Sequence, residues 1–205
     1  MALYWRRYGA RTLLAVWALG CLGLGANLLA FHLVALPSPD PTDHRLVGAL
    51  RTLPKAAGRW QLVHFLYTDC PCASQVADHL LARPSPMNTT EHVVLVGQAP
   101  QLIERLRKLH FTVEVVDEVE LEQRFGVTSV PLLVIADPSG ELRYSGGYST
   151  RKQGPVQEDL SILARLQGGA PVAPLPIFGC AVSRELRQRL DPAGLKDLTF
   201  KGSIR

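Results

Sequence analysis

The stretch of sequence that decides the fold is residues 60–81, WQLVHFLYTDCPCASQVADHLL. Its first part, Gln61–Tyr67, is a short run of apolar and aromatic residues, which is typical of a buried strand. Its last part, Ala73–Leu81, carries apolar residues at helical spacing. Between the two stands Cys70-Pro71-Cys72. The stretch therefore predicts a strand that turns into a helix at a pair of cysteines.

Strands and helices alternate along the chain beyond this stretch. We expect further strands at His92–Val96, Thr112–Val116, Pro131–Ala136 and Glu141–Tyr144, and helices at residues 44–58, 100–109, 118–125, 156–166 and 183–190. Asp137-Pro138-Ser139-Gly140 has the proline and glycine of a tight turn and predicts a hairpin between the last two strands. This order predicts an α/β fold with a mixed sheet flanked by helices.

The two cysteines lie where the predicted helix begins. Unpaired N–H groups and the helix dipole at that end favour a thiolate, and Pro71 suits the first helical turn because it has no N–H to leave unpaired. We therefore expect redox or metal chemistry at Cys70 and Cys72. The alternative is a buried or chance pair of cysteines without chemistry.

A proline follows about 60 residues downstream, in Val130-Pro131, at the start of the fourth strand. A cis bond in such a place would be a deliberate feature; the alternative is a trans proline opening an edge strand. With the cysteine turn and the final hairpin, residues 60–168 resemble the thioredoxin fold. That resemblance implies that Pro131 is cis and borders the cysteines, and that Cys70 takes the position of the nucleophile.

The cysteine motif departs from the usual W-C-x-x-C of that family. Asp69 stands where tryptophan is usual, Ala73 stands where the second cysteine is usual, and Cys72 comes one residue early. A disulfide within C-x-C closes a smaller ring, so we expect it to be strained and easily reduced. The negative charge of Asp69 opposes a thiolate at Cys70.

His64 lies six residues before Cys70, where thioredoxins carry a buried carboxylate that accepts a proton. A histidine titrates near neutral pH and is suited to that task. The alternative interpretation is a half-buried strand residue whose ring has hydrogen-bond partners.

A third cysteine, Cys180, lies beyond the thioredoxin-like region. Cys70-Pro71-Cys72, residues 144–147 (YSGG) and residues 178–180 (FGC) together resemble the RedB-type membrane-anchored thioredoxin-like proteins of bacteria, over residues 60–182. The resemblance implies a thiol–disulfide function outside the cytoplasmic membrane. Three cysteines after the first 36 residues are an odd number, which indicates an exchanging thiol. We expect Cys180 to fold back and pair with Cys70 or Cys72; the alternative is an isolated buried cysteine.

The first 36 residues hold 26 apolar residues, and their only ionised side chains are Arg6, Arg7 and Arg11. The 25 residues from Thr12 to Leu36 are long enough to cross a hydrocarbon core of roughly 30 Å. The arginines before them predict a cytoplasmic N-terminus and an exported domain. A cleaved signal peptide is the alternative, but the apolar stretch is long for one. Cys21, within this stretch, is interpreted as a small apolar residue.

The predicted organisation is a cytoplasmic N-terminus (1–11), a transmembrane anchor (12–36), a linker with a short helix (37–59), a thioredoxin-like domain (60–168) and an extension carrying Cys180 (169–205). Without the three arginines, 19 basic residues face 18 acidic ones, and no basic stripe indicates nucleic acid.

The sequence thus predicts a thiol–disulfide oxidoreductase of the bacterial cytoplasmic membrane that acts on protein partners and needs no cofactor. The first alternative is a Cu(I)-binding module in which Cys70, Cys72 and Cys180 supply soft thiolate ligands. The second is a structural domain of the same fold without catalysis.

Overall fold

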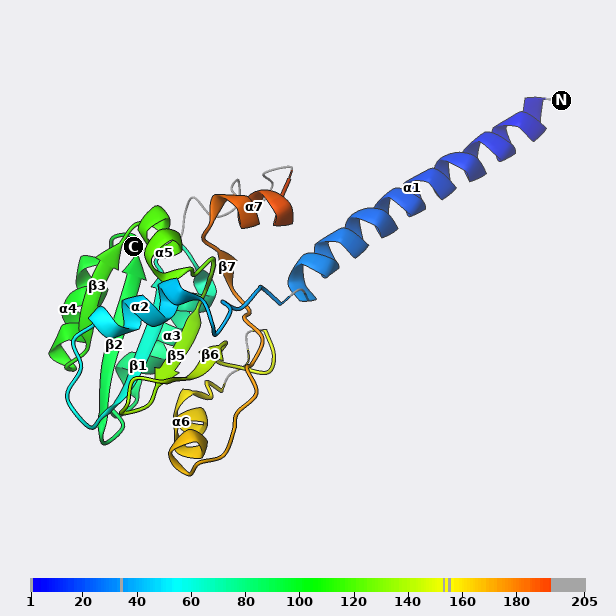
Figure 1. Ribbon diagram of the computed structural model, residues 1–205. Coiled ribbons are helices and arrows are strands. Elements are labelled where there is room, and N and C mark those ends of the chain that lie inside the picture. Colours follow the sequence, from blue (N-terminus) through cyan, green and yellow to red (C-terminus); the bar gives the residue numbers. More distant parts are fainter. Residues whose placement is uncertain (1, 34, 153, 155, 193–205) are drawn as a thin grey trace. The chain divides into compact units, whose positions relative to one another are not determined.

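The structure, a computed structural model, describes residues 2–33, 35–152, 154 and 156–192 (Figure 1). The chain divides after residue 34 into two compact units. Each unit is described by itself. The end of the predicted extension, residues 193–205, lies outside the described residues.

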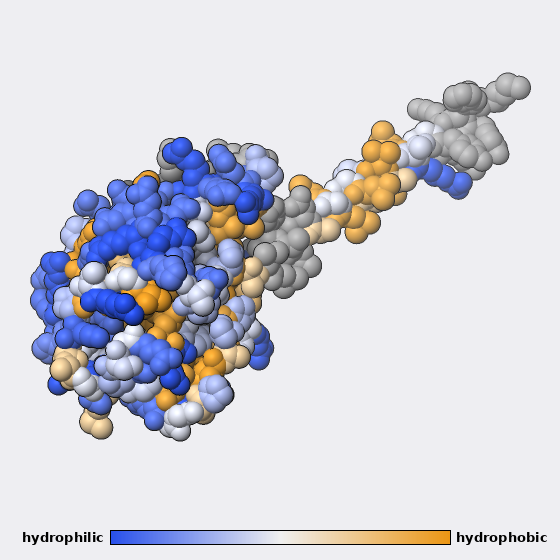
Figure 2. Space-filling model, in the orientation of Figure 1, coloured by the Kyte–Doolittle hydropathy of each residue, from blue (hydrophilic) through white to orange (hydrophobic). Residues whose placement is uncertain are grey.

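The first unit is a single helix, α1 (Ala2–Leu33), with no acidic residue in its first turn. Residues 9–26 form a window of mean hydropathy 1.4 that is long and apolar enough to cross a membrane. Figure 2 shows apolar side chains along this helix, and they include Trp17, which is 69% exposed, and Leu22, which is also 69% exposed. The unit itself therefore offers nothing to bury its apolar surface, and α1 is a candidate membrane span.

The second unit is built on a five-stranded mixed sheet with the strand order β3-β2-β1-β5-β6. The strands are β1 (Trp60–Tyr67), β2 (Thr89–Val96), β3 (Thr112–Val116), β5 (Leu132–Ala136) and β6 (Leu142–Gly146). β1 pairs in parallel with β2, and β2 in parallel with β3. β5 runs antiparallel to β1 and to β6, through the predicted hairpin.

Helices cover both faces of this sheet. The face that we call the α3 face packs against α3 (Pro71–Ala82), α4 (Pro100–Lys108) and α6 (Asp159–Gln167), and the opposite face packs against α2 (His44–Thr52) and α5 (Glu118–Phe125). Figure 1 shows α2 and α5 on the near side of the sheet. Since both faces are covered, the central strand β1 is buried along its inner six residues. This is the thioredoxin-like fold that the sequence predicted.

The helix ends follow from local sequence. Asp43 caps α2 by accepting the backbone N–H of Arg45, and Asp117 caps α5 by accepting the backbone N–H of Glu120. α5 ends at Gly126, which adopts a left-handed conformation with φ of 66°. α3 has no side-chain cap, and it begins with Pro71 directly after Cys70.

The C-terminal extension is part of the folded unit, and this changes the predicted boundaries. A short strand, β7 (Cys180–Ala181), pairs antiparallel with β4 (Ser129–Val130), just before Pro131. Ile177 and Val182, on either side of Cys180, are fully buried in the core. A last helix, α7 (Arg184–Leu190), follows and begins at its cap residue Ser183.

The N-terminal boundary also lies earlier than predicted. Leu36 was expected to end the membrane anchor, but it is buried and its backbone N–H donates to the Ile177 carbonyl oxygen over 2.8 Å. Leu46 of α2 is fully buried as well, and Leu50 is nearly so, so the start at residue 60 is too late. The proline-rich linker hid this packing, because such a segment has no periodicity that indicates which side chains are buried.

Four elements begin later than predicted, β6 and α7 by one residue each, and α6 and β5 for reasons that the structure shows. α6 begins at Asp159 and not at Val156, whose side chain is 60% exposed. β5 begins at Leu132, since Pro131 has no N–H to give to a sheet. All four differences are shifts of one end within an element of the predicted type.

Candidate functional site

The cysteine motif lies after the end of β1, at the start of α3. Cys70 is the residue before the first turn of α3, with φ −103° and ψ 112°, and its carbonyl oxygen accepts the N–H of Ser74. Its side chain is fully buried in the core of the α3 face. Cys72 is partly exposed. The N-terminal cysteine of the pair is thus the buried one, and the second is the one that solvent reaches.

The predicted cis proline borders this motif. The Val130–Pro131 bond is cis, and the Sγ atom of Cys70 lies 4.0 Å from the Val130 carbonyl oxygen. The trans alternative considered for Pro131 is therefore wrong.

Cys180 reaches the same place from the C-terminal extension. It pairs in register with Val130, the residue whose carbonyl oxygen faces Cys70. The thiols of Cys180 and Cys72 both act on the pKa of the Cys70 thiol, which is consistent with their lying beside it. The fold therefore brings two further cysteines towards Cys70, Cys72 from the first turn of α3 and Cys180 from β7.

Glycine is required beside Cys180 by this close approach. A β-carbon on Gly179 would lie 1.8 Å from the Val130 carbonyl oxygen and 2.5 Å from Cδ of Pro131. A β-carbon on Gly147 would lie 2.0 Å from the Pro176 carbonyl oxygen. The FGC and YSGG motifs thus hold the glycines that let the extension lie directly against the cis-proline loop and the end of β6.

The pKa values of Cys70 and Cys72 are both raised. The Cys180 thiol raises the pKa of Cys70, the Cys72 thiol opposes this, burial adds to it, and the result is a pKa of about 12. The pKa of Cys72 is also raised, first by the Cys70 thiol and then by burial, against the positive charge of Lys152. The start of α3 was expected to favour a thiolate at Cys70; the Ala73 N–H acts in that direction, and the Cys180 thiol and burial act against it.

His64 is fully buried in β1, and both of its ring nitrogens have partners. Nδ1 lies 2.7 Å from the hydroxyl oxygen of Tyr148, and Nε2 lies 3.3 Å from Oε1 of Glu91. His64 was expected to accept a proton in the reaction of the cysteines, and the hydrogen-bond partners of its ring are Tyr148 and Glu91. The alternative, a strand histidine whose ring has hydrogen-bond partners, describes the geometry, except that the residue is fully rather than half buried.

A buried network of charges continues from Glu91, and no motif predicted it. Arg83 forms an ion pair with Glu91, and its Nε lies 2.8 Å from Oδ2 of Asp159. Nε2 of His79 lies 2.8 Å from Oδ1 of the same aspartate. Burial acts to raise the pKa of Glu91, but the hydrogen bonds from His64 and Arg83 outweigh it and lower that pKa to about 2. The Glu91 carboxylate is therefore held charged inside the protein.

A narrow pocket lies between Cys72 and Tyr148, the residue whose hydroxyl group bonds to His64. Its walls come from α3, the cis-proline loop, the 148–157 loop and the extension, and the residues are Cys72, Gln75, Val76, Pro131, Tyr148, Ser149, Gly154, Gln157 and Phe178. Tyr148 thus borders Cys72 on one side and bonds to His64 on the other. Burial raises the pKa of Tyr148 well above its usual value, so its phenol keeps its proton.

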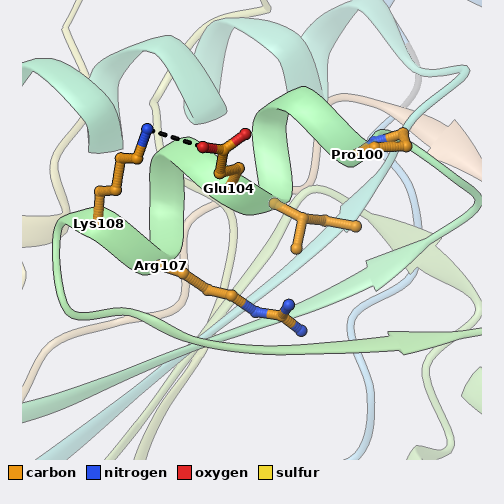
Figure 3. Close-up of a pocket in the computed structure, with 5 residues that line it drawn as sticks. Pro100, Glu104, Arg107 and Lys108 are labelled. Carbon is orange, nitrogen blue, oxygen red and sulfur yellow. Dashed lines mark ion pairs between the residues drawn. The ribbon is translucent and has the colours of Figure 1, made fainter.

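A second and wider pocket is lined by none of the cysteines, and by none of the buried charged residues described above. Figure 3 shows its lining residues on α4 alone, among them Pro100, Arg107 and the exposed ion pair of Glu104 and Lys108, whose atoms lie 2.8 Å apart. Within the described part of the chain, no group of three or more His, Cys, Asp or Glu side chains is arranged to hold a metal ion. The pocket beside Cys72 is therefore the candidate active site.

The chain thus has a thioredoxin-like fold with a C-x-C motif at the start of α3 and a cis proline beside it. A family model described as a domain of unknown function, DUF6436, matches residues 43–160, which is more than half of the chain. The chain belongs to this family. The matched range begins at the cap of α2, in agreement with the burial of that helix, and it ends before Cys180.

Solved structures with a similar arrangement come from several bacteria. An uncharacterized conserved protein from Geobacillus kaustophilus is 18% identical over 62% of this chain and 78% of its own, with a TM-score of 0.49. A secreted Mycobacterium tuberculosis disulfide oxidoreductase homologous to E. coli DsbE is 19% identical over 55% and 83%, with a TM-score of 0.41. StoA from Bacillus subtilis is 21% identical over 52% and 81%, with a TM-score of 0.36. No curated protein matches the chain.

Proposed function

We propose that this chain is a membrane-anchored thiol–disulfide oxidoreductase that acts on protein partners outside the cytoplasm. The observation that carries the proposal is the placement of three cysteines at the cis-Pro131 loop: Sγ of Cys70 lies 4.0 Å from the Val130 carbonyl oxygen, Cys180 pairs in register with Val130, and Cys72 shares a pocket with Pro131. Thiols so close to one another can join as a disulfide and can exchange it, and such exchange needs no bound cofactor.

The exposure of the sulfurs sets the order of events. Cys70 is fully buried, so a partner sulfur reaches the partly exposed Cys72 first. The Cys72 thiolate attacks a partner disulfide, forms a mixed disulfide and releases one partner thiolate. Cys70 then attacks Cys72, which forms the Cys70–Cys72 disulfide and releases the second partner thiolate, so that the partner gains the two electrons that the chain loses. The sequence assigned the first attack to Cys70; its burial favours the second.

His64 and Pro131 serve this reaction without direct contact between His64 and a cysteine. Pro131 shapes the pocket wall beside Cys72. His64 fixes the hydroxyl group of Tyr148, which lies in the same wall. We assign Pro131 and His64 to positioning, and the proton of Cys72 leaves through the open side of the pocket.

The site of action follows from α1 and the residues before it. Arg6 and Arg7 precede the apolar window of residues 9–26 and Arg11 lies near its start, which favours a cytoplasmic N-terminus and an exported domain. The resemblance to RedB-type proteins supports the same placement, with a single-pass anchor in the bacterial cytoplasmic membrane and the domain in the periplasm or at the cell exterior.

A redox titration tests the proposal. The full chain in detergent, purified without oxygen, is equilibrated in glutathione buffers of stepwise potential, and its free thiols are counted after an acid quench. We expect a reversible two-electron couple that Cys70→Ser abolishes and Cys21→Ser leaves unchanged. A chain that holds all its thiols across the whole range would refute the proposal.

Copper delivery is the second candidate, because the thiols of the C-x-C pair, Cys70 and Cys72, are also soft ligands suited to Cu(I). The same anaerobic preparation separates the two functions. Binding of one equivalent of Cu(I) that is lost in Cys72→Ala, without a reversible disulfide couple, would identify the chain as a binding module.

A further inference from the structure

We propose that Cys70 is the central sulfur of a three-cysteine relay, in which one disulfide bond moves between the pairs Cys70–Cys72 and Cys70–Cys180. This inference rests on the proposed function and assigns each thiol a place in it. It makes Cys72 and Cys180 two separate points at which partner thiols and disulfides react.

The relay follows first from which sulfurs meet. Sγ of Cys70 lies 4.0 Å from the carbonyl oxygen of Val130, the residue that pairs with Cys180, and Cys72 follows Cys70 by two residues. Cys70 is the fully buried member of the three. Cys72 and Cys180 are each partly exposed. They come from different parts of the fold, Cys72 from the first turn of α3 and Cys180 from β7. Two reachable sulfurs thus flank one that partners cannot reach.

The Cys180 segment is a fixed part of the fold. Its strand pairs with β4, and the N–H of Val182 donates to the Thr128 carbonyl oxygen over 2.7 Å. Ile177 and Val182 anchor it in the core on both sides, and Gly179 leaves no space against Val130. A partner peptide therefore cannot displace Cys180 without breaking the core, and this thiol stays beside Cys70 throughout the reaction.

The exchange step balances without any further reactant. When the bond joins Cys70 and Cys72, the thiolate of Cys180 attacks Sγ of Cys70. The Cys70–Cys180 bond forms, the Cys70–Cys72 bond breaks, and Cys72 leaves as a thiolate that takes up the proton that Cys180 lost. The positive charge of Lys152 favours that leaving thiolate. The number of disulfides is unchanged, while the exposed sulfur of the disulfide changes from Cys72 in the pocket to Cys180 in the extension.

The experiment follows the position of the bond in the full chain in detergent, in a Cys21→Ser background that leaves the three cysteines. The chain is oxidised with glutathione disulfide, free thiols are blocked with an alkylating reagent, and the linked peptides are identified by mass spectrometry without reduction. We expect two populations, one with Cys180 linked to the peptide that holds Cys70 and Cys72, and one with Cys180 alkylated.

Single serine variants identify the central sulfur. Cys72→Ser and Cys180→Ser should each still form one intramolecular disulfide, and Cys70→Ser should form none. In oxidised Cys180→Ser, Cys72 should no longer be alkylated, because the Cys70–Cys72 disulfide has no third thiol with which to exchange. Circular dichroism of each reduced variant shows whether it has folded.

The outcomes separate this inference from the proposed function. If oxidised chains hold only the Cys70–Cys72 bond, and folded Cys72→Ser forms no disulfide, the relay is wrong while the oxidoreductase stands. If neither the three-cysteine chain nor Cys180→Ser oxidises reversibly, the proposed function fails with it. A disulfide in Cys70→Ser as abundant as in the other variants would also overturn the central place of Cys70.

Discussion

Gly179 lies so close to Val130 that a β-carbon on the glycine would stand 1.8 Å from the valine carbonyl oxygen. Both partners of this contact are backbone, so neither can rotate away. We predict that Gly179→Ala costs about 1–3 kcal/mol of unfolding free energy through overpacking. It should also pull Cys180 away from Cys70, which lowers the yield of the Cys70–Cys180 disulfide in Cys72→Ser. Denaturant unfolding and the disulfide yield are the two measurements.

The matched control is Gly168→Ala at the end of α6. A β-carbon there would meet carbonyl oxygens at 3.4 Å and 3.5 Å, which is ordinary contact. This variant should keep both the stability and the disulfide yield of the parent chain. Equal behaviour of the two alanine variants would show that the extension does not depend on close approach at Gly179.

The two thiols that flank Cys70 act on its pKa in opposite directions, and this gives a second prediction. The Cys180 thiol raises the pKa of Cys70, and the Cys72 thiol lowers it. Cys180→Ala should therefore lower the pKa of Cys70 from about 12, and Cys72→Ala should raise it. The measurement is the ultraviolet thiolate absorbance of the reduced chain against pH, in the Cys21→Ser background. Shifts of the same sign in both variants would contradict this assignment of the two thiols.

The local patterns predicted the fold because its elements are short and strongly marked. The cysteine turn in residues 60–81 becomes β1 and α3, and the Asp137–Gly140 turn joins β5 to β6. β4 and β7 were not predicted, since each has two residues and no local pattern. Each of these strands pairs with a segment 50 residues away in the sequence. Hydrophobic periodicity within one segment does not indicate such a distant partner.

The motifs predicted that Cys70, Cys72, Cys180 and Pro131 belong to one site. In the structure Sγ of Cys70 lies beside the Val130 carbonyl oxygen at the cis-Pro131 bond, Cys180 pairs with Val130, and Cys72 and Pro131 line one pocket. The motifs did not indicate that Cys70 is buried, because burial depends on how distant segments pack around it. The ion pairs of Arg83 were invisible for a similar reason, since buried and exposed charges look alike in a sequence.

Glu91 gives a third prediction, for stability against pH. Its pKa in the folded chain is about 2, below the ordinary value of 4.5, so folding favours its charged form. That contribution to the free energy of unfolding is complete above pH 4.5 and is lost as the pH falls towards 2. Glu91→Gln removes the negative charge that faces the buried side chains of Arg83 and His64. Near neutral pH it should lower the free energy of unfolding by about 3 kcal/mol.

The measurement is denaturant unfolding of the full chain in detergent at several pH values. The difference between the parent chain and Glu91→Gln should shrink between pH 4.5 and 2. Glu104→Gln is the control, because its ion pair with Lys108 is exposed and should change stability by only about 0.5 kcal/mol. A difference that stays constant through this pH range would rule out Glu91 as the titrating group.

Arg83 gives the last prediction, because it is the cation shared by two buried carboxylates. Its side chain is 5% exposed, and it pairs with Glu91 and with Asp159, which are 5% and 0% exposed. Arg83→Ala leaves both carboxylates without their main counter-charge, so we expect a loss of about 3–5 kcal/mol. The matched control is Lys108→Ala, where both members of the pair are mostly exposed (Figure 3) and the expected change is about 0.5 kcal/mol or less. Denaturant unfolding at neutral pH compares the two variants, and a similar small loss in both would mean that the buried charges are balanced by His64 and His79 alone.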